Sequence, residues 1–175
     1  MIEFVSLSAF ETGYIFKSFD CGDANLNKYI RTHALINDKN NLSKTFVCVN
    51  DGVVIGYVTL CSAQVEFEKM PQSYKSSKPR YPVPAIRIAR LAVDFKYQGK
   101  GYGKQLLAYT FKKIVMASEI TGIKVIIVDA KEQSKLFYEK YGFEKLYELT
   151  YYLPIETIIL AIKQWKKDEV AIRLF

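Results

Sequence analysis

A glycine-rich turn at residues 98–104 carries the most recognisable chemistry of this sequence. It reads Gln-Gly-Lys-Gly-Tyr-Gly-Lys and follows an apolar, β-branched stretch at 86–94 that predicts a strand. From Gly103 onward the apolar residues recur with the 3.6-residue period of a helix. Strand, glycine turn and helix N-terminus together present backbone N–H groups and a positive dipole end, which favour a phosphate or pyrophosphate. Glycine suits such a turn because a Cβ would block close approach and because some turn residues need a positive φ.

Spacing excludes two common phosphate-binding loops. A P-loop requires glycine, four residues and then Gly-Lys-Ser/Thr, but Gln98 stands at the first glycine position and Gln105 at the hydroxyl position. The dinucleotide fingerprint G-x-G-x-x-G requires a third glycine at position 104, where this chain has lysine. The pattern that remains is Gln-x-x-Gly-x-Gly over 98–103, after a strand that ends Leu-Ala-Val.

This pattern resembles the acyl-coenzyme A pyrophosphate loop of the GNAT family of N-acetyltransferases, (Gln/Arg)-x-x-Gly-x-(Gly/Ala). An expected strand at 125–130 and then Tyr138, Gly142 and Phe143 follow at the right distance, similar to the Tyr-x-x-x-Gly-Phe helix end of that family. The resemblance implies one GNAT domain over residues 1–175, an α/β (α+β) fold with a central mixed, mostly antiparallel sheet flanked by helices. The C-terminal helix and tail would begin at about residue 154.

The resemblance also implies acetyl-CoA as the acyl donor. Backbone N–H groups at the end of the strand would serve the thioester carbonyl and the pantetheine, and the loop would hold the pyrophosphate, chiefly through its backbone. The implied cofactor-binding residues are Leu91, Ala92, Val93, Gln98, Gly99, Lys100, Gly101, Tyr102, Gly103 and Lys104.

Tyr138 is the candidate general acid. Acyl transfer from a thioester to an amine needs a proton for the departing thiolate, and a phenol with a reference pKa of about 10 stays protonated at neutral pH. Tyr138 lies roughly 200° around the helix from Leu136, so it can reach a cleft if Leu136 faces the core. The alternative is that Tyr138 only packs, as most tyrosines do.

Two positions depart from the family pattern. Lys131 stands where many members have an asparagine, which leaves that contribution to cofactor binding open. The central strand carries Arg87 and Arg90 but no carboxylate to act as a general base. A lysine ε-amine, with a pKa of about 10.4, needs such a base more than an α-amine at about 7.7–8.0 does, and an amine next to an ester is more acidic still. An aminoacyl-tRNA carries an amine of this kind.

A narrower resemblance favours the same acceptor. Phe19-Asp20-Cys21-Gly22 with Leu26, and the segments 80–84, 90–94, 128–130 and 137–138, resemble in order the toxin branch of the family. Those type II toxin–antitoxin acetyltransferases acetylate aminoacyl-tRNA. The resemblance implies a catalytic tyrosine at Tyr138, a basic tRNA-binding surface and a small ribbon-helix-helix antitoxin. The candidate contacts to tRNA phosphates are Arg80, Arg87, Arg90 and Lys96, with Lys100 and Lys104 shared with the cofactor.

Length and composition limit the classes of protein to which this chain can belong. A chain of 175 residues suits one domain with its own core, and a net charge of +7 favours acidic partners. Cys21, Cys48 and Cys61 are widely spaced and His33 is the only histidine, so we expect free thiols and no metal site. The N-terminus does not resemble a signal peptide, and no apolar run approaches the about 20 residues that span a bilayer. These features predict a cytoplasmic protein away from membranes.

Two other functions stay open. A small-amine or protein/peptide N-acetyltransferase would acetylate polyamines, amino acids or peptides and ignore charged tRNA. A non-catalytic acyl-CoA-binding module would bind the cofactor and transfer nothing. The oligomeric state is open as well, with a homodimer among the alternatives.

Periodicity and turn residues predict the remaining elements. We expect one helix that carries Leu26, Tyr29, Ile30, His33 and Ala34 on a stripe, with Asp23 as its N-cap and His33 as a packed rather than a catalytic histidine. Four prolines predict a long loop without regular structure at 69–85, either a binding loop or a solvated insertion. Further expected elements are strands at 2–7, 45–49, 53–60 and 149–153, a hairpin turn at 50–52, a helix at 103–118 closed by Gly122, and a helix after Pro154.

Overall fold

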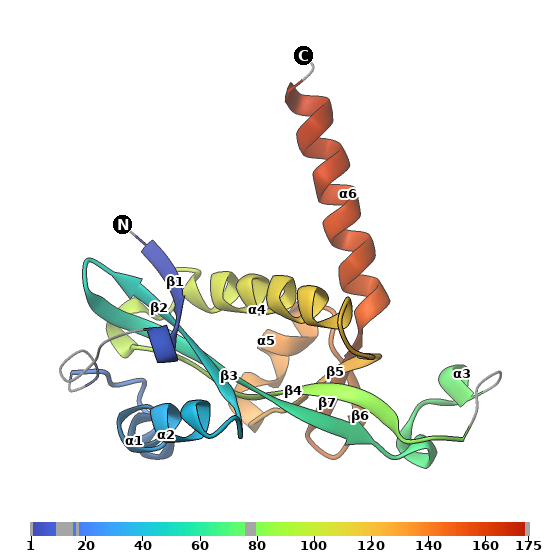
Figure 1. The fold of residues 1–175 in the computed structure, drawn as a ribbon, viewed down its shortest axis with the longest axis horizontal. Coiled ribbons are helices and arrows are strands. Elements are labelled where there is room, and N and C mark those ends of the chain that lie inside the picture. The colour runs from blue at the N-terminus through green and yellow to red at the C-terminus, as the bar shows by residue number, and fades with distance from the viewer. Residues whose placement is uncertain (1, 10–15, 17, 76–79, 174–175) are drawn as a thin grey trace. The chain divides into compact units, whose positions relative to one another are not determined.

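The computed structural model describes residues 2–9, 16, 18–75 and 80–173, with side chains up to Gln164. Its strands are β1 Ile2–Ser6, β2 Lys44–Asn50, β3 Val53–Val65, β4 Val83–Val93, β5 Val125–Asp129, β6 Glu144–Tyr147 and β7 Thr150–Pro154 (Figure 1). Its α-helices are α1 Ala24–Thr32, α2 Ala34–Lys39, α3 Gln72–Lys75, α4 Tyr102–Ser118, α5 Lys135–Lys140 and α6 Ile155–Arg173. The described chain also forms the 3₁₀ turns η1 Leu7–Ala9, η2 Phe67–Lys69, η3 Phe95–Tyr97 and η4 Glu132–Ser134.

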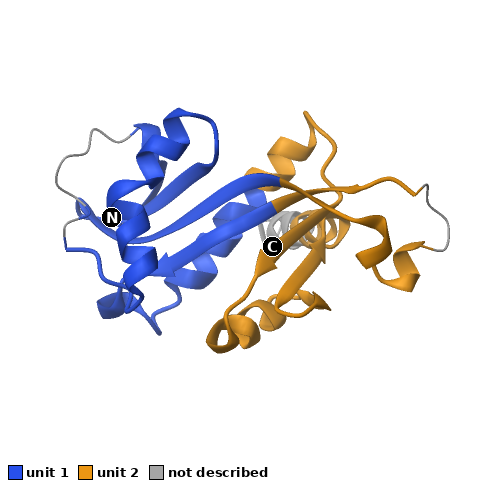
Figure 2. Ribbon diagram, turned by 90° about the horizontal axis from the view of Figure 1, so that it is seen from below, with its two compact units in different colours: residues 1–62, 87–112 blue, residues 63–86, 113–175 orange. Residues whose placement is uncertain are grey.

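The strands form a seven-stranded, mostly antiparallel sheet in the order β1-β2-β3-β4-β5-β7-β6. This confirms the predicted α+β fold class. The chain clusters into two compact units, residues 1–62 with 87–112 and residues 63–86 with 113–175 (Figure 2). We call them unit 1 and unit 2 and describe each separately.

Unit 1 is built on an antiparallel meander. β1 pairs with β2, and β2 pairs with β3 around a bulge between Cys48 and Val49. The predicted hairpin turn is confirmed, because Asp51 and Gly52 both have positive φ, 47° and 78°, as a type I′ turn requires. The core of this unit gathers buried residues of β2, β3 and α1 with Leu7, Phe19 and Ala92.

Unit 2 contains a second antiparallel set. β7 pairs with β5 on one side and with β6 on the other. Its core joins Val125, Ile127 and Tyr152 to buried residues from the β3 end, the connection after it and the start of β4, namely Val65, Met70, Val83 and Ala85. The sequence pattern missed β6, whose four residues alternate poorly between exposed and half-buried positions.

The prediction of a single helix around Tyr29 is wrong. Asp23 does cap α1, because its side chain accepts from the backbone N–H groups of Asn25 and Leu26, but α1 ends at Thr32 and α2 begins at Ala34. The Thr32 hydroxyl donates to the Lys28 carbonyl at 2.7 Å, a back-bond of the kind that bends helices. His33 therefore lies at the break, where its side chain is exposed but its ring packs against Tyr29, with the two ring centroids 6.4 Å apart.

Two further expectations about loops are wrong. The 69–85 segment contains α3 and the first residues of β4, and Pro84 is accommodated because it lies exposed within that strand. Residues 76–79, which include Pro79, lie outside the described part. α4 does end at Ser118 as predicted, but Gly122 has no positive φ; Thr121 N–H donates to the Ala117 carbonyl at 3.0 Å instead.

Candidate active site

The turn between β4 and α4 has the geometry of an anion cradle. After η3 the chain makes a turn in which Gly99 and Gly101 have φ values of 72° and 86°. Only glycine adopts this region without strain. A Cβ built on either glycine would meet no heavy atom within 4 Å, so nothing in the described chain fills the space above them. The positive φ, rather than crowding by a neighbouring segment, is therefore the reason for glycine at both positions.

The start of α4 supplies the donors of this cradle. Gln105 N–H donates to the Gly101 carbonyl at 3.1 Å, which begins the helical hydrogen-bond pattern. The N–H groups of Tyr102, Gly103 and Lys104 precede it, and the first N–H groups of a helix have no partner within the helix. They lie at the positive end of a 17-residue helix. Such an arrangement favours an anionic group such as a phosphate.

Gly56 in β3 is a packing residue behind the turn that the sequence motifs missed. A Cβ there would lie 2.7 Å from Cδ1 of Leu106 and 3.0 Å from the Ala92 carbonyl oxygen. The first turns of α4 can thus approach the end of β4 only because position 56 has no side chain. A lone glycine inside a β-branched strand was the signal, since it often marks a close approach.

The basic candidates of unit 1 differ in exposure. Lys96, Lys100 and Lys104 are exposed around the glycine turn, and the Lys100 ammonium lies 5.4 Å from the Tyr97 ring centroid. Arg90 is half-buried, with its guanidinium carbon 3.6 Å from the Tyr29 ring centroid, so one face of the cation is already covered. Arg87 is also half-buried and has interaction partners. The three lysines are therefore the most accessible of these cations.

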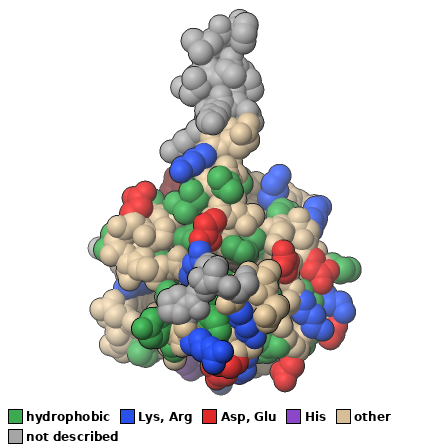
Figure 3. All heavy atoms as spheres, turned by 90° about the vertical axis from the view of Figure 1, so that its right-hand side faces the viewer, with side chains coloured by type: hydrophobic (Ala, Val, Ile, Leu, Met, Phe, Trp, Pro, Cys, Tyr) green, Lys and Arg blue, Asp and Glu red, His purple; other side chains and the backbone are tan. Residues whose placement is uncertain are grey.

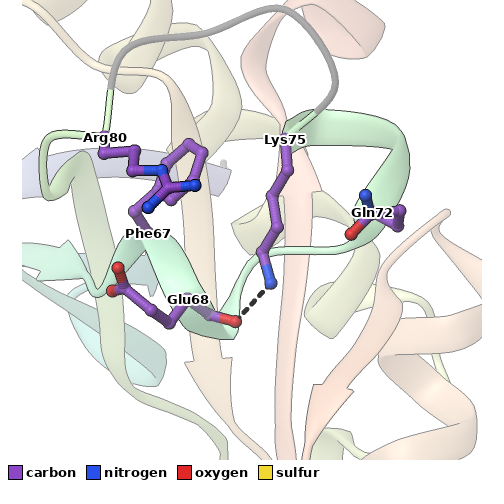
Figure 4. Close-up of a pocket in the computed structure, with 5 residues that line it drawn as sticks. All are labelled: Phe67, Glu68, Gln72, Lys75 and Arg80. Carbon is purple, nitrogen blue, oxygen red and sulfur yellow. Dashed lines mark hydrogen bonds between the residues drawn. The ribbon is translucent and has the colours of Figure 1, made fainter.

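Arg80 belongs to unit 2 and lines a cavity of about 370 Å³ with Phe67, Glu68, Gln72 and Lys75 (Figure 4). Its side chain is separate from that of Lys75, whose ammonium donates to the Glu68 carbonyl. On the face of the molecule in Figure 3, basic and acidic side chains alternate and form no patch of a single sign. Because Glu68, Gln72 and Lys75 line the same cavity, Arg80 lies in a mixed polar environment.

Tyr138 lies on α5 in unit 2 and is only 5 % exposed. Leu136 is 71 % exposed, so the premise that Leu136 faces the core is wrong, and the 200° separation places Tyr138 inward instead. The Tyr138 ring packs edge-to-face against Phe137 and Phe143, with centroids 5.2 and 5.5 Å apart. Burial raises the pKa of Tyr138, which keeps the phenol protonated.

The Tyr-x-x-x-Gly-Phe pattern has a structural explanation. Tyr141 N–H and Phe143 N–H both donate to the Tyr138 carbonyl, at 2.9 and 3.2 Å, and Gly142 has a φ of 86°. This left-handed residue ends α5 and turns Phe143 back onto the Tyr138 ring. Among the described residues, no hydrogen bond to the Tyr138 hydroxyl is formed, so its proton is not committed to a neighbour.

The other polar groups offer little competing chemistry. Cys48 is buried, which raises the pKa of its thiol to about 11, whereas Cys21 and Cys61 are half-buried free thiols. Within the described ranges, no three His, Cys, Asp or Glu side chains gather as a metal site would require. In the same part of the chain, none of the helices has the length and apolarity of a membrane span.

Comparisons with known proteins identify the family. A family profile described as "Acetyltransferase (GNAT) domain" matches residues 41–145, which include both the glycine turn and Tyr138. The chain belongs to the GNAT acetyltransferase family. It is an acetyltransferase of the acetyl-CoA-dependent type, which confirms the predicted enzyme class and cofactor.

Three similar proteins indicate the branch of this GNAT family. The chain is 37 % identical over 128 residues to a tRNA-acetylating toxin of Mycobacterium tuberculosis, covering 73 % of this chain and 76 % of that protein. It is similar to AtaT complexed with acetyl-methionyl-tRNAfMet, with a TM-score of 0.86, 27 % identity and 93 % and 99 % of the two chains covered. It is also similar to a tyrosine-to-phenylalanine mutant of AtaT bound to the C-terminus of the antitoxin AtaR and acetyl-CoA, with a TM-score of 0.78, 26 % identity and 92 % and 98 % covered.

Proposed function

We propose that this GNAT protein is a toxin that transfers the acetyl group of acetyl-CoA to the α-amino group of aminoacyl-tRNA. The observation that carries the proposal is the open cradle of N–H groups at the start of α4, directly after two glycines of positive φ. The similarity to a tRNA-acetylating toxin and to AtaT with its acetylated tRNA supports the choice of acceptor.

The roles of the residues follow from their chemistry. Backbone N–H groups between Gly99 and Lys104 bind the pyrophosphate, and Lys100 and Lys104 add positive charge around it. Backbone groups of Leu91, Ala92 and Val93 orient the pantetheine arm. Bound acetyl-CoA supplies an activated thioester. Burial keeps the phenol of Tyr138 neutral, and this phenol gives its proton to the departing sulfur.

The acceptor assignment depends on the missing general base. β4 carries Arg87 and Arg90 but no carboxylate. An α-amine next to an ester loses its proton more readily than a lysine ε-amine does, so it needs no dedicated base on this strand. Lys96 with Arg80, Arg87 and Arg90 would contact phosphates of the tRNA, a sequence-independent attraction that the net charge of +7 supports.

The proposal includes a partner and a compartment. AtaT is bound by the C-terminus of the antitoxin AtaR, and we infer a small antitoxin of comparable role for this chain. Because charged tRNA is a cytoplasmic molecule, the proposed substrate places the activity in the cytoplasm.

The experiment measures transfer from radiolabelled acetyl-CoA to a panel of acceptors. The panel holds elongator and initiator aminoacyl-tRNAs, the same tRNAs without amino acid, spermidine, free amino acids and peptides. We expect label on charged tRNA, released by base as an N-acetylamino acid, and none on uncharged tRNA. Label only on polyamines or peptides would favour the small-amine or peptide enzyme. Tight coenzyme A binding with no transfer to any acceptor would favour the binding module.

A further inference from the structure

The segment Asp20–Gly22 of unit 1 is hydrogen-bonded to the turn that follows β4. Asp20 N–H donates to Oδ2 of Asp94 at 3.0 Å, and Phe95 N–H donates back to the Asp20 carbonyl at 2.7 Å. Gln98 Nε2 donates to the Cys21 carbonyl at 3.0 Å. Three bonds thus join two stretches of chain that are more than 70 residues apart in sequence. The Phe-Asp-Cys-Gly motif, which the catalytic roles leave without a function, is one side of this connection.

The same segment is itself held in one conformation. Oδ1 of Asp20 accepts from Gly22 N–H at 2.9 Å and from Nδ2 of Asn27 at 2.7 Å. Hydrogen bonds from Gly22 and then from Asn27 lower the pKa of Asp20. Oδ1 of Asn27 accepts from Cys21 N–H at 2.9 Å. The Asn27 side chain therefore holds both residues whose backbone contacts the turn, and it does so from the first turn of α1.

On the other side, two side chains determine how the chain leaves β4. Asp94 is 6 % exposed, and its second oxygen accepts from Lys96 N–H at 3.0 Å. Gln98 also donates to the Val93 carbonyl at 3.0 Å, while its own backbone N–H donates to the Phe95 carbonyl at 3.3 Å. The donors of Gln98 are therefore used to shape the turn, one residue before the open glycines begin.

We propose that Asn27, Asp94 and Gln98 are positioning residues for acetyl-CoA, and that residues 20–22 brace the pyrophosphate turn. None of the three needs to touch the cofactor. Asn27 fixes the Cys21 peptide, Gln98 fastens the turn to it, and Asp94 sets the chain direction, so that the N–H groups after Gly99 are aligned before the pyrophosphate arrives. The inference rests on the proposed assignment of this turn to the pyrophosphate.

The first test removes and restores the donor of Gln98. For Gln98→Ala we expect the Kd of coenzyme A, measured by isothermal titration calorimetry, to rise about tenfold, because two hydrogen bonds that hold the turn are lost. The KM for acetyl-CoA should rise in parallel while kcat at saturation stays within about twofold. Gln98→Arg, which retains donors for both carbonyls, should restore the Kd. A Kd unchanged in Gln98→Ala would overturn the proposal.

The second test uses Asn27, which lies outside the turn. We expect Asn27→Ala to raise the Kd of coenzyme A about fivefold, and the matched control Asn25→Ala, an exposed neighbour on α1, to leave it unchanged. The double variant Asn27→Ala/Gln98→Ala should raise the Kd by less than the product of the two single effects, because both act through the Cys21 peptide.

Two outcomes of the second test distinguish a brace from a contact that only stabilises the fold. If Asn27→Ala lowers the Tm but leaves the Kd at the wild-type value, Asn27 is only a stabilising residue and the brace is wrong. If the two effects multiply fully, Gln98 does not act through Cys21. A failure of the pyrophosphate assignment itself is seen differently, as an unchanged Kd when Gly101 is replaced, so the two failures are distinguishable.

Discussion

The glycine turn of unit 1 and the Tyr138 helix of unit 2 obtain their geometry by opposite means. The turn is shaped by backbone conformation and polar contacts: two glycines with positive φ, a buried Asp94 and the bonds of Gln98. Its functional surface is left open, with no heavy atom of the described chain near the glycines. A binding element of this kind exposes its backbone N–H donors, while the side chains that hold it in place lie away from the open surface.

The α5 helix has only six residues and depends on aromatic packing. Phe137 and Phe143 enclose the Tyr138 ring, and the left-handed Gly142 brings Phe143 into place. Burial raises the pKa of the phenol, so Tyr138 holds its proton. The difference teaches that the binding site we propose in unit 1 uses exposed backbone, whereas the proton donor we propose in unit 2 is a buried side chain. Substitutions in unit 1 and in unit 2 can therefore test cofactor binding and proton donation separately.

The largest expected effect belongs to Tyr138→Phe. Only the hydroxyl is removed and the ring packing is kept, so we expect turnover to fall by roughly 10²–10⁴, the range for loss of a general acid. The Kd of coenzyme A should stay at the wild-type value. Single-turnover acetyl transfer and calorimetry measure the two quantities. The control is Tyr141→Phe at the end of α5, which should leave turnover unchanged; a loss of less than tenfold for Tyr138→Phe would assign the proton to another group.

Gly101→Val tests the open backbone of the turn. Valine at a φ of 86° is strained by about 1–3 kcal/mol, and its side chain would enter the open space where we propose that the phosphates lie. We expect the Kd of coenzyme A to rise about 10–100-fold, because the strained turn relaxes away from the binding conformation in the free protein and because the side chain blocks close approach. Gly52→Val in the β2–β3 hairpin, with a φ of 78°, is the matched control: it should lower the Tm and spare the affinity. Unchanged affinity in Gly101→Val would place the pyrophosphate elsewhere.

The sequence predicts the turn better than it predicts the helix. Glycine spacing, the strand before Gln98 and the periodicity after Gly103 all lie within about 20 residues, so local rules sufficed for the cradle. The antiparallel sheet was implied by the resemblance to the GNAT family, and the Asp23 cap followed from a similarly local signal. The inward orientation of Tyr138 did not, because it depends on which face of a six-residue helix the rest of the fold covers.

Contacts distant in sequence account for the missed role of Gln98, and other features account for the remaining errors. The bonds from Asp20 and Cys21 to the turn join residues more than 70 apart, so no local pattern assigns Gln98 a supporting role. The break at His33 coincides with a hydrogen bond from the Thr32 hydroxyl to the Lys28 carbonyl, and the regular structure at 72–75 and 83–85 forms despite the prolines around it. Propensity rules describe what a segment prefers, and tertiary contacts overrode that preference here.

Tyr152→Phe makes the same chemical change as Tyr138→Phe elsewhere in unit 2. The Tyr152 hydroxyl donates to a carboxylate oxygen of Glu144 at 3.0 Å, across the β6–β7 pair. Losing that bond should lower the free energy of unfolding by about 1 kcal/mol. Acetyl transfer and coenzyme A affinity should not change. Urea unfolding measures the first quantity, and a fall in turnover for Tyr152→Phe would mean that the effect of Tyr138→Phe is not specific to its position.

The pH profile is the smallest effect and tests the buried phenol directly. A general acid acts in its protonated form, so activity declines when pH rises through its pKa. Burial raises the pKa of Tyr138, which moves that decline above the ordinary value of about 10. On aminoacyl-tRNA, kcat/KM should therefore rise as the α-amine deprotonates and then stay level up to about pH 9.5. Initial rates of N-acetyl product, corrected for ester hydrolysis, give the profile. A decline of kcat/KM centred at about pH 8 would require a proton donor that is more acidic than a desolvated tyrosine, and Tyr138 would then have only a packing role.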